Sequence, residues 1–210
     1  MTGITNGIYR VCEWVFRFAY VNLLWAVFTL VGLGLFGFMP ATTAMFAVIR
    51  KWVLGDNEVP IFSTFWESYR REFVKANLLG IILFIIGYLI TIEFQILIKA
   101  IGPFYYIARF GVIAQFILYI MVLMYFFPVF VHFKIKIGYY FNLPFMMCFL
   151  YPVLTMFLLV TIFLIHYLTF IIMPGLIFFF GGSVTAFLLM WGSCKVFPYF
   201  QIKSSQAIEM

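Results

Sequence analysis

Few side chains in this sequence are suited to acid, base or nucleophilic chemistry. Only seven acidic residues and two histidines occur among 210 residues. No H-E-x-x-H, G-x-S-x-G or Walker A sequence is present, and the three cysteines lie far apart without a C-x-x-C pair. Such patterns normally supply metal ligands, a nucleophile or a phosphate-binding loop. We therefore expect no catalytic residues, no metal site, no cofactor and no enzymatic activity.

Two titratable residues, Glu93 and His166, fall within strongly apolar stretches. An ionisable side chain inside a membrane is a candidate functional group. Glu93 lies close in sequence to Lys99 and Arg109, so it forms either an interfacial ion pair or part of an ion or substrate site. His166 either hydrogen-bonds to a neighbouring helix or relays protons. Both alternatives remain open for each residue.

Three other patterns that suggest chemistry have structural explanations. Glu13 and Arg17 are four residues apart and are expected to pair on one helix. His132 neighbours Lys134 at the end of an apolar stretch, where solvation explains it. The run from Gly32 to Gly37 matches G-x-G-x-x-G, but it lies in an apolar stretch rather than between a strand and a helix. We expect its glycines to permit close approach between helices.

The elements that carry these side chains are membrane helices. Hydrophobic residues make up 66% of the chain and charged residues 10%, with a mean hydropathy of +1.14. Soluble domains have roughly 45–50% apolar and about 25% charged residues. This composition excludes a soluble enzyme, a secreted disulfide scaffold, a disordered chain and a nucleic-acid-binding protein. The net charge of +6 is better explained by topology and by contact with anionic lipid headgroups.

Uncharged stretches predict five membrane spans, because a span needs about 20 mostly apolar residues. We expect breaks at Pro40 and at Met173-Pro174-Gly175, while Pro144 and Pro152 can both bend the fourth span. The predicted fold is an all-α polytopic helix bundle in a single integral membrane domain. Its expected spans cover residues 18–39, 76–98, 106–132, 147–172 and 176–194.

The distribution of lysine and arginine predicts an orientation in the bacterial plasma membrane. With five spans, nine basic residues fall on one side and four on the other. The side richer in lysine and arginine is normally cytoplasmic. We therefore expect the amino terminus outside and the carboxyl terminus in the cytoplasm. Arg10 and Arg17, which flank the first span, argue for the reverse.

Residues 40–75, between the first two spans, are predicted to form a cytoplasmic amphipathic segment. A helix from Pro40 should end before Gly55, and a second helix should run from Ile61 to Lys75. The second helix has a stripe of aromatic residues typical of a helix lying in the membrane interface. Expected ion pairs on it are Glu67 with Arg71 and Glu72 with Lys75.

Two interpretations of this segment remain open. It either packs on the bundle and helps to fix topology, or it forms a docking surface for a cytoplasmic or membrane partner. The candidate residues for binding a partner or lipid are Arg50, Lys51, Trp52, Phe62, Phe65, Trp66, Tyr69, Arg70, Arg71, Phe73 and Lys75.

The first third of the chain resembles the YesL-like family of small bacterial membrane proteins. The family is a domain of unknown function whose genes often lie beside carbohydrate importers and glycoside hydrolases. The resemblance therefore implies a role alongside carbohydrate uptake and offers no catalytic residues. The matching segments are Asn22-Leu-Leu-Trp25, Gly32-x-Gly34-x-Phe36-Gly37, Pro40-Ala-Thr-x-Ala44, Arg50-Lys-Trp52 and Phe65-Trp66-x-x-Tyr69-Arg-Arg-Glu-Phe73-x-Lys75-x-Asn77.

Our leading hypothesis from the sequence is a non-enzymatic accessory subunit or partner of an ABC-type carbohydrate importer. Its expected contacts are the lipid bilayer and the permease subunits, with a homo-oligomer as a further possibility and no nucleic acid. The alternative is an independent, oligomeric transporter or channel for a small solute. A membrane enzyme acting on lipid or glycan has the least support, because the required side chains are missing.

Overall fold

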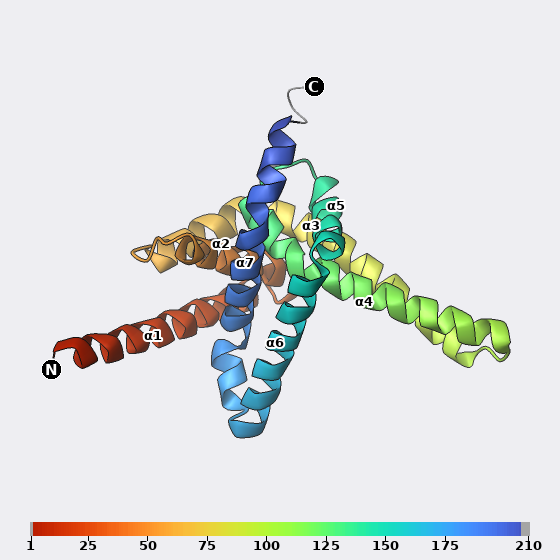
Figure 1. The fold of residues 1–210 in the computed structure, drawn as a ribbon, viewed down its shortest axis with the longest axis horizontal. Helices are drawn as coiled ribbons and strands as arrows, with labels where there is room; N and C mark the ends of the chain where they lie inside the picture. Colours follow the sequence, from red (N-terminus) through yellow and green to blue (C-terminus); the bar gives the residue numbers. More distant parts are fainter. Residues whose placement is uncertain (1, 207–210) are drawn as a thin grey trace.

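The computed structural model describes residues 2–206, with the side chains of residue 7 and residues 9–200. Seven α-helices and no strand occur among these residues (Figure 1). The helices are α1 (Thr2–Val31), α2 (Leu35–Val53), α3 (Ile61–Lys99), α4 (Pro103–His132), α5 (Tyr139–Leu150), α6 (Pro152–Ile172) and α7 (Gly175–Gln206).

Five of the helices are long and apolar enough to cross a membrane, as the sequence predicted. The predicted all-α fold with about five spans is confirmed, and the chain is a multi-pass membrane protein. The spanning segments are Tyr9–Val31 of α1, Ile61–Lys99 of α3, Pro103–His132 of α4, Pro152–Ile172 of α6 and Gly175–Phe200 of α7.

The first reversal of the chain lies earlier than the expected break at Pro40. The turn is Gly32-Leu33-Gly34, where Leu33 and Gly34 have φ angles of 60° and 75°. A Cβ on Gly32 would lie 2.3 Å from Cα of Gly37, so only glycine permits so tight a reversal. The predicted close approach at these glycines therefore occurs between the end of α1 and the start of α2.

Pro40 lies inside α2 instead of beginning it. Proline has no N–H, so the carbonyl of Phe36, four residues earlier, loses its normal helical donor. The side-chain amide of Asn77 on α3 donates to that carbonyl at 2.9 Å. This bond compensates for the missing backbone donor and ties α2 to α3.

Helix α2 is the most centrally packed element, although the sequence placed most of it in a cytoplasmic segment. Its buried residues include Ala41, Ala44, Val48 and Ile49, all fully or almost fully covered. The helix contacts α1, α3, α4 and α7. Its end agrees with the prediction: Gly55 has a φ of 97°, and its N–H donates to the carbonyl of Trp52.

Helix α3 has no break between residues 75 and 76, so the expected amphipathic helix is the first part of a 39-residue helix. The region expected as the fourth span is also divided differently. Helix α5 ends at Leu150 and α6 begins at Pro152, because proline is favoured in the first turn of a helix. The turn between α6 and α7 falls at Met173 and Pro174, where the sequence predicted it.

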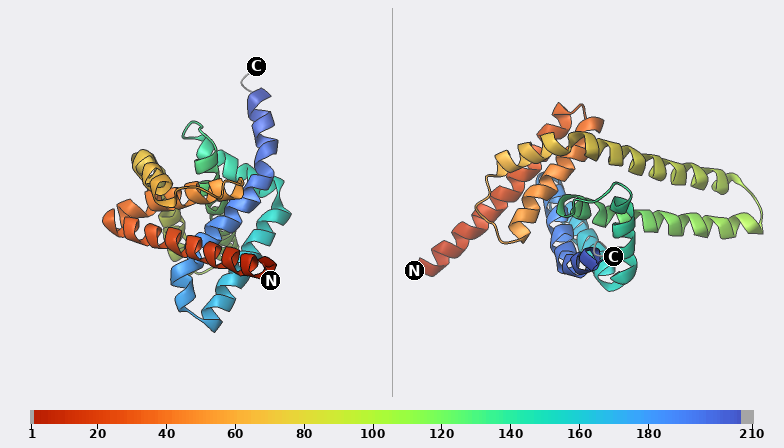
Figure 2. Two further views of the ribbon diagram at one scale, coloured as in Figure 1. Left: turned by 90° about the vertical axis from the view of Figure 1, so that its left-hand side faces the viewer. Right: turned by 90° about the horizontal axis from the view of Figure 1, so that it is seen from above.

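Several segments extend from the packed centre of the molecule (Figure 1). They are the amino-terminal half of α1, the α3–α4 hairpin, the α6–α7 hairpin and the carboxyl-terminal end of α7. The views in Figure 2 show that the α3–α4 hairpin reaches far beyond every other helix. The core lies where α2 meets α1, α4 and α7, and its fully buried side chains include Val21, Ile49, Tyr125 and Met190.

The bond from Asn77 to the carbonyl of Phe36 should stabilise the fold because of Pro40. Replacing Asn77→Leu should lower the free energy of unfolding by about 1–3 kcal/mol, since it leaves that carbonyl without a donor. In a Pro40→Ala background the restored N–H should make the same change cost less. Unfolding of the purified variants in mixed detergent micelles measures both effects. An equal cost in both backgrounds would contradict this account.

Candidate interaction surfaces and the central cavity

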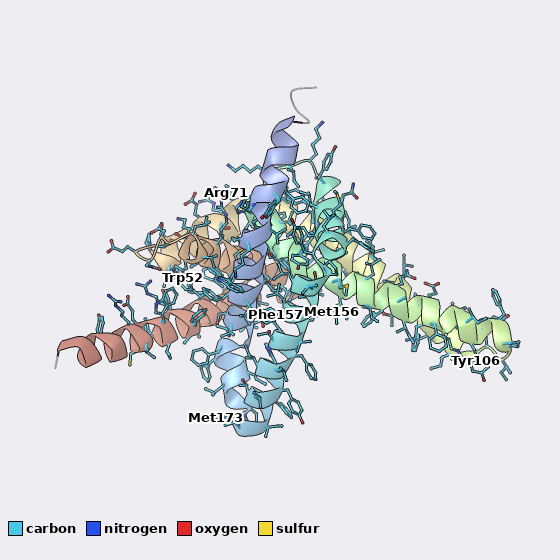
Figure 3. All side chains as sticks on the ribbon, in the orientation of Figure 1. Trp52, Arg71, Tyr106, Met156, Phe157 and Met173 are labelled. Carbon is cyan, nitrogen blue, oxygen red and sulfur yellow. The ribbon has the colours of Figure 1, made fainter. Side chains whose placement is uncertain are left out.

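The predicted docking residues on α2 and α3 form a buried and an exposed set, with Arg50, Phe73 and Lys75 half-buried. Trp52, Phe65 and Tyr69 are buried in the bundle. Figure 3 shows Trp52 between α2 and the neighbouring helices, whereas Arg71 points away from the centre. We call the exposed set the α2–α3 surface; it comprises Lys51, Phe62, Trp66, Arg70 and Arg71.

Aromatic residues of α3 from both sets pack around Phe28 of α1. The ring of Phe28 lies 5.3 Å from that of Phe65, 5.6 Å from Trp66 and 5.1 Å from Tyr69. The hydroxyl of Tyr69 also donates to the carbonyl of Phe28 at 3.2 Å. Tilted aromatic contacts of this kind each contribute about 0.5–1.5 kcal/mol beyond burial. Most of the predicted stripe therefore holds α3 on the bundle.

Most basic residues of the predicted set are engaged within the chain. Nε of Arg50 donates to Nδ1 of His132 at 3.2 Å, and the His132 ring lies 4.2 Å from that of Phe197. His132 is thus packed rather than simply solvated. Nζ of Lys75 donates to the Tyr140 hydroxyl at 2.8 Å, and Nζ of the exposed Lys51 donates to the Thr64 hydroxyl at 3.2 Å.

The expected ion pairs are partly present. Arg71 lies 3.5 Å from Glu67, as predicted, and 3.0 Å from Glu72. Glu72 therefore pairs with Arg71 instead of Lys75, which turns toward Tyr140. Glu13 and Arg17 form their predicted pair on α1. These exposed or half-exposed pairs each contribute little to stability.

Glu93 is not paired with Lys99 or Arg109, contrary to one expectation. Arg109 instead donates to the carbonyls of Leu97 and Ala100, at 3.0 and 2.8 Å, at the end of α3. It neutralises the unsatisfied carbonyls that every helix end leaves. Within the described part of the chain Glu93 forms no ion pair, and its carboxyl group is exposed on the α3–α4 hairpin.

A groove follows the α3–α4 hairpin and contains three exposed polar side chains. Glu93 and Gln115 line a cleft of about 500 Å³, and Gln115 and Asn142 line a second of about 380 Å³. Gln115 lines both clefts, which we together call the hairpin groove. Near Glu93 the groove floor has the small residues Ala108 and Gly111. Figure 3 shows the hairpin tip, with Tyr106, far from the rest of the molecule.

Sequence reasoning missed Gln115 and Asn142. The search for membrane polar residues considered only titratable side chains, and neither amide is titratable. Gln115 lies within the uncharged stretch used to predict the third span. An amide within a span is itself a signal, because it can hydrogen-bond to another helix in the membrane.

His166 borders an open cavity between the helices, which we call the central cavity. It has a volume of about 620 Å³ and is lined by residues of α1, α2, α4, α6 and α7. Nδ1 of His166 lies 2.9 Å from the carbonyl oxygen of Ile162, and Nε2 lies 3.4 Å from the hydroxyl of Thr185 on α7. The expected contact between His166 and a neighbouring helix is therefore present.

Asn22 joins α1 to α7 beside the same cavity. Its amide nitrogen donates to the carbonyl of Phe178 at 2.7 Å, and its oxygen accepts from the N–H of Ser183 at 3.1 Å. A Cβ on Gly182 would lie 2.7 Å from the Asn22 oxygen, so this approach requires glycine. Asn22 thus stabilises the cavity wall by bonding to one C=O group and one N–H group of the α7 backbone.

Comparisons with known proteins match less than half of the chain. Residues 18–94 match the family described as protein of unknown function, DUF624. Three Bacillus subtilis (strain 168) proteins are similar: YteU, 53% identical over 45% of this chain; YesV, 50% over 38%; and YesL, 45% over 38%. The matched parts span 43%, 38% and 38% of those relatives, well under two thirds of their length. No solved structure matches this chain.

The two sets of aromatic residues on α3 should respond differently to mutation. Phe65 is fully buried, so Phe65→Ala should lower the free energy of unfolding by about 3–5 kcal/mol. Trp66 is 43% exposed, so Trp66→Ala should lower the free energy of unfolding clearly less. Unfolding of both purified variants in detergent tests the division. Equal losses would mean that both residues belong to the core.

Proposed function

Because residues 18–94 are YesL-like, we propose that this chain is a non-enzymatic accessory protein of an ABC-type carbohydrate importer. It binds a transmembrane helix of the permease in the hairpin groove. The class of importer rests on the resemblance, since genes of YesL-like proteins often lie beside carbohydrate importers. The mode of binding rests on the groove itself.

The observation that carries the proposal is the exposed amide of Gln115. It is the thirteenth of the 30 residues of α4, about 18 Å from the helix start at 1.5 Å per residue. None of its polar atoms bonds to another described residue. An amide facing hydrocarbon without a partner is unfavourable by about 2–7 kcal/mol, depending on the reference state. A second protein helix that hydrogen-bonds to it removes that cost.

The rest of the groove suits a helix as its occupant. Glu93 and Asn142 add polar groups on either side of Gln115, so a bound helix meets hydrogen-bonding groups along its length. Gly111 has open space where a Cβ would lie, which allows a neighbouring backbone to approach closely. The fitting partner is a membrane helix with serine, threonine, asparagine or basic side chains on one face.

The α2–α3 surface offers a second contact on the same partner. Trp66 and Arg70 lie on the helix that also contributes Glu93, so one continuous α3 carries both contacts. Aromatic and arginine side chains are enriched at protein interfaces. A partner that occupies the hairpin groove within the membrane can therefore also contact these residues outside it.

The first test is purification of the tagged protein from its native membrane in mild detergent, with mass spectrometry of what accompanies it. We expect two permease subunits and a nucleotide-binding subunit. Combining Gln115→Leu with Glu93→Gln should lower their recovery about tenfold, because lost hydrogen bonds across helices are worth about 1–2 kcal/mol. Gln95→Leu, an exposed amide only four residues from the end of α3 and on its opposite face, outside the groove, is the matched control and should leave recovery unchanged.

Two results contradict the proposal at different levels. Full recovery with the double variant removes the groove from the interaction but keeps the partner. Recovery of the protein alone, or only with itself, removes the accessory role. Flux of solute into proteoliposomes that contain this protein alone then tests the alternative of an independent transporter.

The orientation of the chain is a further part of the proposal. Helix α2 returns alongside α1: the Trp14 and Trp52 rings are 5.6 Å apart, and Arg17 donates to the carbonyl of Asn57. These contacts bring the amino-terminal half of α1 near the loop between α2 and α3. We infer that α2 is a sixth crossing, of about 28 Å. The amino end then lies on the same side of the membrane as the loop between α2 and α3, which we place in the cytoplasm. Five spans would instead place the amino end outside.

Labelling of single cysteines distinguishes the two orientations. In a variant with Cys148→Ala and Cys194→Ala, only the exposed Cys12 remains. A membrane-impermeant maleimide should then leave intact cells unlabelled and react after permeabilisation. Ile101→Cys at the hairpin tip, with all three native cysteines replaced, should react in intact cells. Labelling of Cys12 in intact cells would instead support an outer amino terminus.

A further inference from the structure

The central cavity has the size and lining of a binding site for an apolar molecule. Its volume of about 620 Å³ falls within the usual range of about 300–1,000 Å³ for ligand sites. The walls are largely apolar and include Ile120, Phe127 and Phe178. No lysine, arginine, aspartate or glutamate lines it, so a charged headgroup finds no counter-charge there.

Nearly all polar side chains in the wall are already engaged. Asn22 uses its amide nitrogen and oxygen on the backbone of α7. The indole N–H of Trp25 donates to Thr42 at 3.0 Å, and the hydroxyl of Thr42 donates to the carbonyl of Phe38 at 2.7 Å. These bonds therefore hold the wall together and leave few polar atoms free for a ligand.

His166 is different because one of its ring nitrogens faces a group that has no hydrogen to give. The carbonyl of Ile162 can only accept, so Nδ1 carries the proton and Nε2 of the neutral ring is an acceptor. The Thr185 hydroxyl, 3.4 Å from Nε2, donates to the carbonyl of Gly181 at the much shorter distance of 2.7 Å. The single hydroxyl hydrogen of Thr185 is shared between these two acceptors, so Nε2 keeps acceptor capacity for a ligand.

We infer that the central cavity binds a neutral lipid alcohol, such as a diacylglycerol. Its hydroxyl donates to Nε2 of His166, and its hydrocarbon chains lie against the apolar walls. Diacylglycerols are membrane lipids, and α4 and α6, which line the cavity, also expose apolar side chains that suit contact with the bilayer. This inference stands independently of the importer partner, since it concerns a different part of the molecule.

Two other occupants fit less well. A sugar has several hydroxyl groups, and the engaged polar groups of the wall leave most of them unpaired at a substantial desolvation cost. A buried water normally makes two to four hydrogen bonds, but the wall offers one open acceptor beside Thr185. A lipid alcohol has one hydroxyl donor and a large apolar body, which match the open acceptor and the apolar walls of the cavity.

The test uses the purified full chain in phosphatidylcholine nanodiscs with a diacylglycerol that carries a photoreactive diazirine in one acyl chain. Adducts should form on cavity-lining residues of α4 and α7, and unlabelled dioleoylglycerol should suppress them. Its O-methyl ether, which lacks the O–H donor, should compete about tenfold less well, as expected for one hydrogen bond.

A matched pair of variants tests the role of the imidazole. His166→Phe keeps a ring but removes the acceptor, so it should weaken binding about tenfold and abolish the preference for the alcohol over the ether. Tyr167→Phe, at an exposed neighbouring position, should change neither. Equal competition by alcohol and ether in the unmodified protein, or adducts spread over the lipid-facing surface, would overturn the inference even if His166→Phe failed to fold.

Discussion

The structure depends on one constraint: in an apolar medium, backbone N–H and C=O groups must find partners within the protein. This chain meets it with side chains placed where its helices are interrupted. Asn77 serves the carbonyl that Pro40 leaves open, and Arg109 serves the carbonyl end of α3. At the end of α4, the Tyr140 hydroxyl donates to the carbonyl of Phe133 and accepts from the N–H of Ile135. The scarce polar side chains are thus spent mainly on the backbone.

Because most polar side chains bond to the backbone, those that do not are candidates for binding other molecules. Arg109 is spent at a helix end, which leaves Glu93 without the cation that its position suggests. Asn22 hydrogen-bonds to the backbone of α7. The Gln115 amide and the Nε2 atom of His166, in contrast, keep hydrogen-bonding capacity for another molecule. In a protein with 10% charged residues, such capacity points outward to partners and ligands.

Helix α3 connects the parts of the molecule that the proposals invoke. Its first turns are held by Phe28 and by the burial of Phe65, and its last turns form the hairpin with α4. At 39 residues it spans about 57 Å, longer than the roughly 30 Å hydrocarbon core. A partner bound along it can contact the α2–α3 surface and the hairpin groove together.

The sequence by itself determined the membrane location, the all-α class, five long apolar helices, the resemblance of the first third to YesL-like proteins, and the helix ends at Gly55 and Met173. These follow from composition, from local hydropathy and from residues that stop helices in their own neighbourhood. Only the tertiary structure decided that α2 is buried, that Lys75 turns to Tyr140, and that the central cavity exists. Such features depend on contacts between distant segments, such as Asn22 with Ser183, 161 residues apart. Local patterns carry no record of those contacts, because burial and pairing are properties of the assembled bundle.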